Sequence, residues 1–129
     1  MSSPHRTSAT GPADPDDAWR RYTTRELWST WSPQIRSVRP GGRIRPGDRG
    51  VVLGLLVAVV PFTILARDDA ARRWSWRVGV RPLAVRMDHG IDVVDGGCTA
   101  WMDLHGPAAL GAAYAPFARR ALEHLATGT

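Results

Sequence analysis

The stretch RRWSWRVGVRPLAVRMDHGIDVVDGGCTAWMDLHG (residues 72–106) decides the fold, because its turns and its alternating side chains can be aligned together. A two-residue turn at residues 81–82 (RP) pairs Trp76 with Met87 and Trp74 with His89 on two antiparallel strands. Residues directly opposite one another on neighbouring strands point to the same face of a sheet. The first hairpin therefore places both tryptophans and the histidine on one face.

A second hairpin follows in the same stretch. A Gly-Gly turn at residues 96–97 is a strong hairpin signal, and it pairs Ile91 with Met102 and His89 with Leu104. A slip of one residue in either turn would exchange the partners along the strands. The two alignments agree on the faces, which supports both turns.

The aligned strands have one apolar and one polar face. The apolar face, which carries a single imidazole, contains Trp74, Trp76, Val78, Val85, Met87, His89, Ile91, Val93, Ala100, Met102 and Leu104. The polar face, which carries a single tryptophan, contains Ser75, Arg77, Arg86, Asp88, Asp92, Thr99, Trp101, Asp103 and His105. We expect the first face to form a core or a pocket wall and the second to face water.

Two features of the polar face need an interpretation. Asp88 and His105 lie opposite each other and resemble a catalytic dyad, but we interpret them as a surface pair. Trp101 is expected to cover the outer face or an interface, and its apolar ring there is a weak indication of a homodimer.

The rest of the chain alternates in the same way between short elements and turns. We expect a short polar strand at residues 5–11, a helix capped by Asp14 with Pro15 in its first turn, and a second short helix at residues 25–31. A strand (residues 32–38), a Gly- and Pro-rich loop (39–50) and several strands (51–104) follow. Residues 106–127 read as a helix kinked at Pro116, with an apolar stripe of Leu110, Tyr114, Phe117, Ala121 and Leu125. This order predicts an α+β fold.

Length and charge limit the classes of protein that the chain can belong to. Its 129 residues suit a single domain over residues 1–129, with residues 1–4 as a flexible tail. All 17 basic residues are Arg and the net charge is +5, but the arginines are scattered from Arg6 to Arg120 without a nucleic-acid motif. We therefore expect no nucleic-acid partner.

The sequence shows no signal for a membrane or an oxidising compartment. The N-terminus is polar, and the longest apolar run (residues 51–66) is shorter than the roughly 20 residues of a membrane helix and contains Gly54 and Pro61. Cys98 is the only cysteine, so no disulfide forms within the chain. We expect a cytoplasmic protein without a membrane partner.

At this point the chain resembles a known group. The segments DDAWRRYTTRELWSTWSPQIRSV, GDRG, RRWSWRV and DHGIDVVDGGCTAWMDLHGP, with the final amphipathic helix, resemble the START/Bet v 1-like (SRPBCC) superfamily and its polyketide cyclase/dehydrase-like branch. The resemblance runs from about Ala13 to Leu125 and rests on spaced Trp, Gly and His positions. It implies a helix-grip fold, in which a curved antiparallel β-sheet wraps around a long C-terminal helix, with two short helices near the N-terminus and an apolar cavity inside.

The chain departs from that group in two places. Its first strand is unusually polar, and the loop over residues 39–50 is short and rich in Gly and Pro. Both could change the mouth of the cavity. The resemblance implies binding of a hydrophobic, polyketide-like or aromatic molecule, with cyclisation and dehydration without a cofactor in secondary metabolism. The alternative is a non-catalytic binding or carrier protein of the same fold.

The candidate site residues follow from the apolar face and the implied cavity. His89 is the candidate for proton transfer, since burial would keep its imidazole neutral, and Tyr114 is the candidate donor to a developing enolate oxygen. The candidate ligand-binding residues are Trp28, Trp31, Trp74, Trp76, Met87, Ile91, Met102, Leu110 and Phe117. For each of them core packing is the alternative reading. The four histidines lie on different elements and no Cys-x-x-Cys occurs, so we expect no metal site.

Overall fold

The computed structural model describes residues 4–54, 59–80, 82 and 84–129. Within these residues, seven strands form one antiparallel sheet in the order β1-β7-β6-β5-β4-β3-β2. The strands are β1 (His5–Gly11), β2 (Ile35–Arg39), β3 (Arg49–Gly54), β4 (Val59–Asp68), β5 (Arg73–Val78), β6 (Val85–Val94) and β7 (Gly97–His105). The helices are α1 (Pro15–Thr23), the 3-10 turn η1 (Arg25–Leu27), α2 (Trp28–Trp31) and α3 (Ala108–Thr127).

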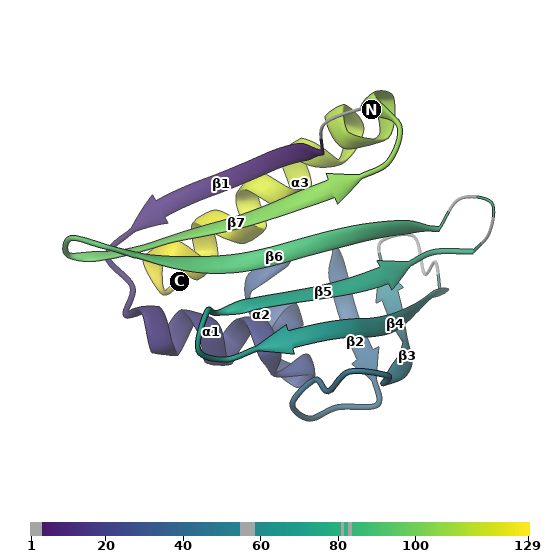
Figure 1. Cartoon of the computed structure of the whole chain (residues 1–129), viewed down its shortest axis with the longest axis horizontal. Coiled ribbons are helices and arrows are strands. Elements are labelled where there is room, and N and C mark those ends of the chain that lie inside the picture. The colour runs from purple at the N-terminus through teal and green to yellow at the C-terminus, as the bar shows by residue number, and fades with distance from the viewer. Residues whose placement is uncertain (1–3, 55–58, 81, 83) are drawn as a thin grey trace.

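All the helices lie on one side of the sheet (Figure 1). The long α3 packs behind β1 and β7, and α1 and α2 lie behind the middle and lower strands. The buried apolar side chains form one cluster between these layers. The expected helix-grip fold is confirmed.

The first hairpin has the predicted register. Trp74 lies opposite His89, Trp76 opposite Met87 and Val78 opposite Val85. Residue 81 of the predicted turn lies outside the described residues, as does residue 83, which follows the turn.

In the second hairpin the pairing is shifted by two residues from the predicted register. Its turn is Asp95–Gly96, with Gly96 at φ 76°, so His89 lies opposite Met102 and Val94 opposite Gly97. Asp-Gly is itself a preferred hairpin turn because its second residue adopts positive φ without strain. A shift of two residues leaves every side chain on its predicted face, so the faces are right although the pairing was wrong.

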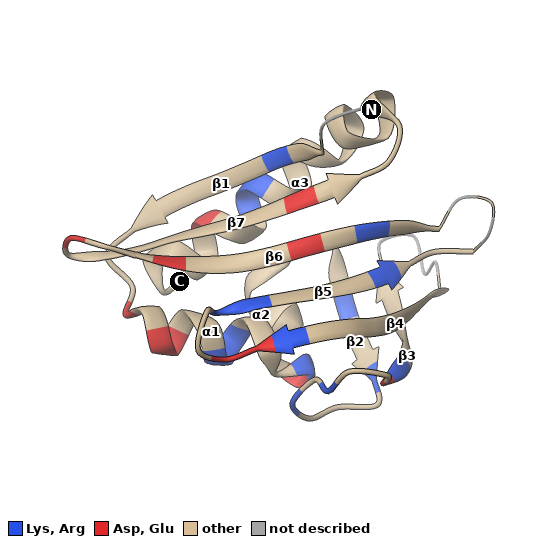
Figure 2. Cartoon of the chain, viewed as in Figure 1, with Lys and Arg blue, Asp and Glu red and all other residues tan. Residues whose placement is uncertain are grey.

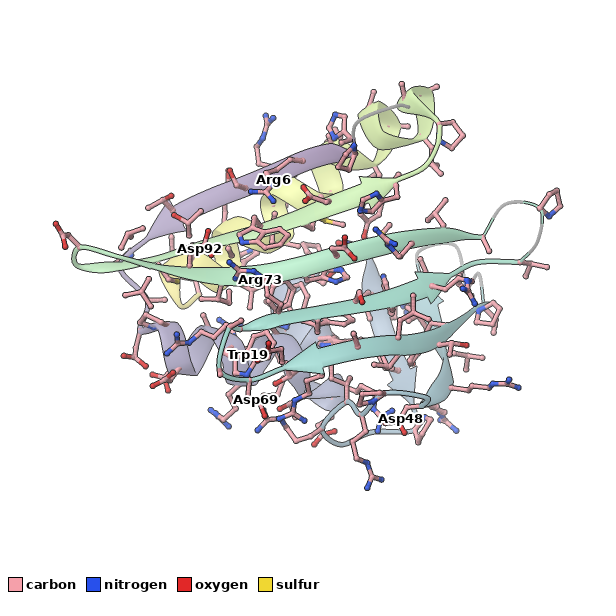
Figure 3. The ribbon with its side chains drawn as sticks, viewed as in Figure 1. Arg6, Trp19, Asp48, Asp69, Arg73 and Asp92 are labelled. Carbon is pink, nitrogen blue, oxygen red and sulfur yellow. The ribbon has the colours of Figure 1, made fainter. Side chains whose placement is uncertain are left out.

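The outer face carries both positive and negative charges (Figure 2), and Trp101 lies between two of its arginines. Its ring is only 7 % exposed and is flanked by the guanidinium groups of Arg6 and Arg73, at 4.2 and 4.9 Å from the ring centroid. Arg6 binds Asp103 through two hydrogen bonds of 2.7 and 2.8 Å, and Arg73 binds Asp92 at 2.7 Å (Figure 3). Trp101 is thus covered within its own chain, and its ring leaves no apolar patch to indicate a homodimer.

The N-terminal helices form as the sequence predicts. The Asp14 carboxylate accepts from the backbone N–H groups of Asp16 and Asp17 and so caps α1. Trp28 and Trp31 donate their indole N–H groups to backbone carbonyls at the end of α1, which fixes α2 against it.

The apolar stripe predicted on α3 is only partly right. Ala121 and Leu125 are buried, but Leu110 and Phe117 are 41 % and 44 % exposed. The buried positions are Gly111, Ala118, Ala121, Leu122, Leu125 and Ala126, and Pro116 lies inside the helix. The stripe fails at its N-terminal end because an open chamber, and not packed core, lies beside Leu110.

Candidate functional site

An apolar chamber of about 370 Å³ lies between the sheet and α3. Its lining is Gln34, Ile35, Val52, Gly54, Val60, Trp76, Val78, Gly79, Val85, Met87, Leu104, Leu110 and Tyr114. No described residue of this lining carries a charge. We call this space the outer chamber.

A second, much smaller space of about 30 Å³ lies deeper in the molecule. Its lining is Tyr22, Trp28, Trp31, Ser32, Gln34, Ile35, Trp74, Trp76, Met87, His89, Met102, Tyr114, Ala118, Ala121 and Leu122. A space of this size holds one or two water molecules and no larger ligand. We call it the inner chamber.

The two chambers share one wall. Gln34, Ile35, Trp76, Met87 and Tyr114 line both of them. Within this wall the side-chain amide of Gln34 donates a 2.7 Å hydrogen bond to the Tyr114 hydroxyl, which joins the start of β2 to α3. The polar groups of the outer chamber are therefore gathered at its inner end.

Tyr114 remains a neutral phenol at physiological pH. Burial raises the pKa of its hydroxyl, and the hydrogen bond from Gln34 opposes this only in part. A neutral phenol that accepts one hydrogen bond still has its own proton to donate. Tyr114 can thus donate to an oxygen atom of a ligand in the outer chamber.

His89 lines only the inner chamber of the two. Its imidazole stacks on the Trp74 indole, with ring centroids 3.8 Å apart and planes 9° from parallel, and its Nδ1 lies 3.3 Å from the Trp74 carbonyl oxygen. Burial lowers the pKa of His89 to about 3. The side chain is therefore neutral, as expected, but the shared wall separates it from the outer chamber.

An aromatic cluster surrounds His89. Tyr22 meets the imidazole edge-on at 5.4 Å, and Trp28 stacks on Trp74 at 5.5 Å. Offset-stacked and edge-to-face pairs at these distances are favourable arrangements. Many of the aromatic residues that the sequence predicts to line a pocket therefore form a packed cluster around the inner chamber.

Several buried polar atoms in this region have no hydrogen-bond partner within the described part of the chain. They are Ser32 Oγ, Gln34 Oε1, Trp74 Nε1 and Trp76 Nε1. Buried polar atoms are nearly always paired, with protein or with bound molecules. Their concentration around the inner chamber makes this the polar end of an otherwise apolar cavity.

The candidate ligand-binding residues are distributed over different places. Trp76, Met87 and Leu110 line the outer chamber. Trp28, Trp31, Trp74 and Met102 line the inner chamber but not the outer one. Ile91 lines neither and is packed core at 1 % exposure. Phe117 lines an open groove with Trp31, Arg120 and His124 between α2 and α3, outside both chambers.

Sequence reasoning missed much of the outer chamber. Gln34 lies beside a proline with no pattern to mark it, and it borders both chambers and the groove. Val52 and Val60 lie in the apolar run, where alternation on paired strands could have placed them on the inner face. Val78, Val85 and Leu104 were assigned to the apolar face but not to the ligand.

Two further features are absent from the described residues. No cluster of three or more His, Cys, Asp or Glu side chains there could hold a metal ion. No helix of that part of the chain is long and apolar enough to cross a membrane.

Comparison with known proteins decides the family. The sequence pattern of the family described as "Polyketide cyclase / dehydrase and lipid transport" matches residues 5–128. The chain belongs to this family. The family and the fold together support the binding of a hydrophobic ligand. None of the curated proteins matches the chain.

Solved structures share the fold at low sequence identity. The MLL2253 protein of Mesorhizobium loti is 16 % identical over 93 % of both chains, with a TM-score of 0.76. Ara h 8.0201 is 16 % identical over 93 % of this chain and 95 % of its own, with a TM-score of 0.67. DynU16, from the dynemicin biosynthetic locus, is 17 % identical with a TM-score of 0.73. The whole of the present chain aligns with 49 % of DynU16, so it spans about half the length of the DynU16 chain.

Proposed function

We propose that this family member binds an uncharged hydrophobic small molecule in the outer chamber. The observation that carries the proposal is an apolar space of about 370 Å³ whose described lining residues include no charged side chain. Burying an unpaired charge there would cost several kcal/mol, by the order-of-magnitude penalty for desolvating an ion. A carboxylate or an ammonium group is therefore excluded from the depth of the chamber.

The ligand carries an oxygen acceptor at its inner end. Gln34 and Tyr114 are the polar side chains of the outer chamber, and they are already joined by a hydrogen bond. Ligand pockets commonly combine apolar walls with a few polar groups that fix orientation. A ketone or an ester oxygen beside Tyr114 would accept its free proton while the apolar body fills the valine-rich end.

A matched pair of probes tests this proposal. We expect 2-acetylnaphthalene to quench the fluorescence of Trp76 and to bind at least tenfold more tightly than 2-naphthoate, which differs by its negative charge. Equal affinity for the two probes would show that the chamber does not discriminate against charge. The absence of binding to any naphthyl probe would count against the outer chamber as a ligand site.

Cyclisation and dehydration of a polyketide is the second candidate function. An aldol cyclisation removes a proton from a carbon beside one carbonyl, joins that carbon to a second carbonyl and then loses water, without a cofactor. Tyr114 would stabilise the enolate oxygen and His89 would accept the proton. With a pKa of about 3, His89 is a weak base, so this function requires a ligand group that enters the inner chamber and raises that pKa.

One variant, His89→Phe, separates the candidate functions. In an enzyme, His89→Phe abolishes turnover of a candidate polyketide and leaves its binding intact. In a carrier protein, no turnover occurs and His89→Phe leaves the affinity unchanged. Turnover that survives His89→Phe removes this residue from the mechanism.

A further inference from the structure

Exposed apolar side chains surround the mouth of the outer chamber. Val59 and Val80 are 64 % and 65 % exposed, and Leu110 is 41 % exposed. Val59 and Val80 adjoin the lining residues Val60 and Gly79, and Leu110 itself lines the chamber. Large apolar side chains grouped at one opening favour contact with another molecule.

These three residues come from opposite sides of the opening. Val59 begins β4, Val80 follows the end of β5, and Leu110 lies in the first turn of α3. The ends of these elements lie at the same end of the molecule, on the right of Figure 1.

Arginines accompany this apolar rim on the outer face. Arg36, Arg77 and Arg86 are exposed and adjoin the lining residues Ile35, Val78 and Val85. Arg36 and Arg77 form no ion pair within the described residues, and Arg77 lies directly opposite Arg86. Like charges opposite one another destabilise a sheet. Arg86 has an acidic neighbour, Asp88 at 3.4 Å, but Arg77 has no ion-pair partner among the described residues, so this arrangement favours a further anionic neighbour. Figure 2 shows the blue segments at the right-hand ends of β5 and β6.

We propose that the mouth of the chamber docks on an anionic lipid bilayer. A bilayer surface covers separate apolar protrusions at once, since each can enter the acyl boundary while the arginines contact lipid phosphates. It also leaves the mouth open toward the acyl chains, where an apolar ligand is dissolved. This proposal departs from the sequence-based expectation of no membrane partner. That expectation rested on an apolar run too short to span a membrane, and peripheral docking needs no such segment.

Vesicle sedimentation of the ligand-free protein tests the docking independently of any bound ligand. The protein sediments with vesicles of phosphatidylcholine and phosphatidylglycerol, not with phosphatidylcholine alone, and high salt releases it. Arg36→Gln combined with Arg77→Gln weakens binding roughly thirtyfold, at about fivefold per arginine. Val59→Asp combined with Val80→Asp abolishes it.

Matched controls keep the test specific. Val93→Asp changes an equally exposed valine (62 %) beside the turn at the other end of β6, and Arg20→Gln combined with Arg119→Gln removes two exposed arginines elsewhere. Both controls retain vesicle binding. Failure to bind anionic vesicles overturns the proposal. An equal loss of vesicle binding in the control variants also overturns it. Binding to soluble polyglutamate that the arginine variants lose and the valine variants keep would indicate an acidic protein partner instead, and would overturn the proposal as well.

Discussion

The imidazole of His89 lies flat on the indole of Trp74, with ring centroids 3.8 Å apart. The two residues are direct partners on β5 and β6, and the imidazole N–H points to the Trp74 carbonyl. Burial in the aromatic cluster keeps the histidine neutral, and the hydrogen bond to the Trp74 carbonyl opposes this only in part. We therefore expect His89 to affect the stability of the fold more than the binding of a ligand.

The stability of the protein should therefore depend on pH through His89. Its pKa is about 3 in the folded chain, against about 6.5 when exposed, so between these values the unfolded chain binds the extra proton. Stability should fall as the pH is lowered through this window, by about 1.4 kcal/mol per pH unit. Urea unfolding at pH 7.5 and pH 5.0 should show a loss of about 2 kcal/mol from this residue.

The matched control for this effect is His89→Phe, which keeps a flat ring against Trp74. This variant should lose about 2 kcal/mol less than the parent between the same two pH values. The same pH dependence in both proteins would mean that another group carries the proton.

Gly90 should be intolerant of a side chain because of Trp101. A Cβ atom at Gly90 would collide with the Trp101 ring, which two arginines hold in place. Gly90→Ala should cost about 1–3 kcal/mol of unfolding free energy, as other overpacked sites do. In the Trp101→Leu background the same change should cost less, and thermal unfolding of the four proteins measures the difference. Additive costs would rule out this collision as the cause.

The fold was predictable because its decisive information is local. Alternation on paired strands assigned Trp74, Trp76 and His89 to the inner face. The turn at Asp95–Gly96 was misplaced by one residue, which shifts the pairing by two and leaves the faces unchanged. The α3 stripe was less secure, because the side of a helix that is buried depends on what lies beneath it. At Leu110 an open chamber lies there, which no helical period reveals.

The site was less predictable than the fold. The predicted apolar face includes both cavity and core residues. The boundary of the cavity, however, depends on how side chains from elements far apart in the sequence pack against one another. Gln34 and Tyr114 are 80 residues apart, and their hydrogen bond forms the inner wall. Likewise, Phe117 faces a groove and not the cavity because of the rotation of α3.

Removal of the Tyr114 hydroxyl should affect polar ligands selectively. Tyr114→Phe should weaken 2-acetylnaphthalene by about tenfold, the order expected for one lost hydrogen bond, and leave 2-ethylnaphthalene unchanged. Fluorescence titration of both probes measures this. An equal loss for the two probes would point to a change in chamber shape and not to a missing donor.

Filling the outer chamber should block the ligand without unfolding the protein. Val85→Phe adds volume into open space, so the free energy of unfolding should change by less than about 1 kcal/mol while probe affinity falls at least tenfold. Val93→Phe, at an exposed position near the turn, is the control that should change neither quantity. Undiminished affinity in Val85→Phe would place the ligand elsewhere.

The location of the ligand is measured most directly by methyl NMR of the complex with 2-acetylnaphthalene. The account predicts contacts between probe protons and the methyl groups of Val78, Val85 and Leu104, which all line the outer chamber. Contacts confined to Phe117 and its groove, with the chamber methyl groups unperturbed, would contradict it.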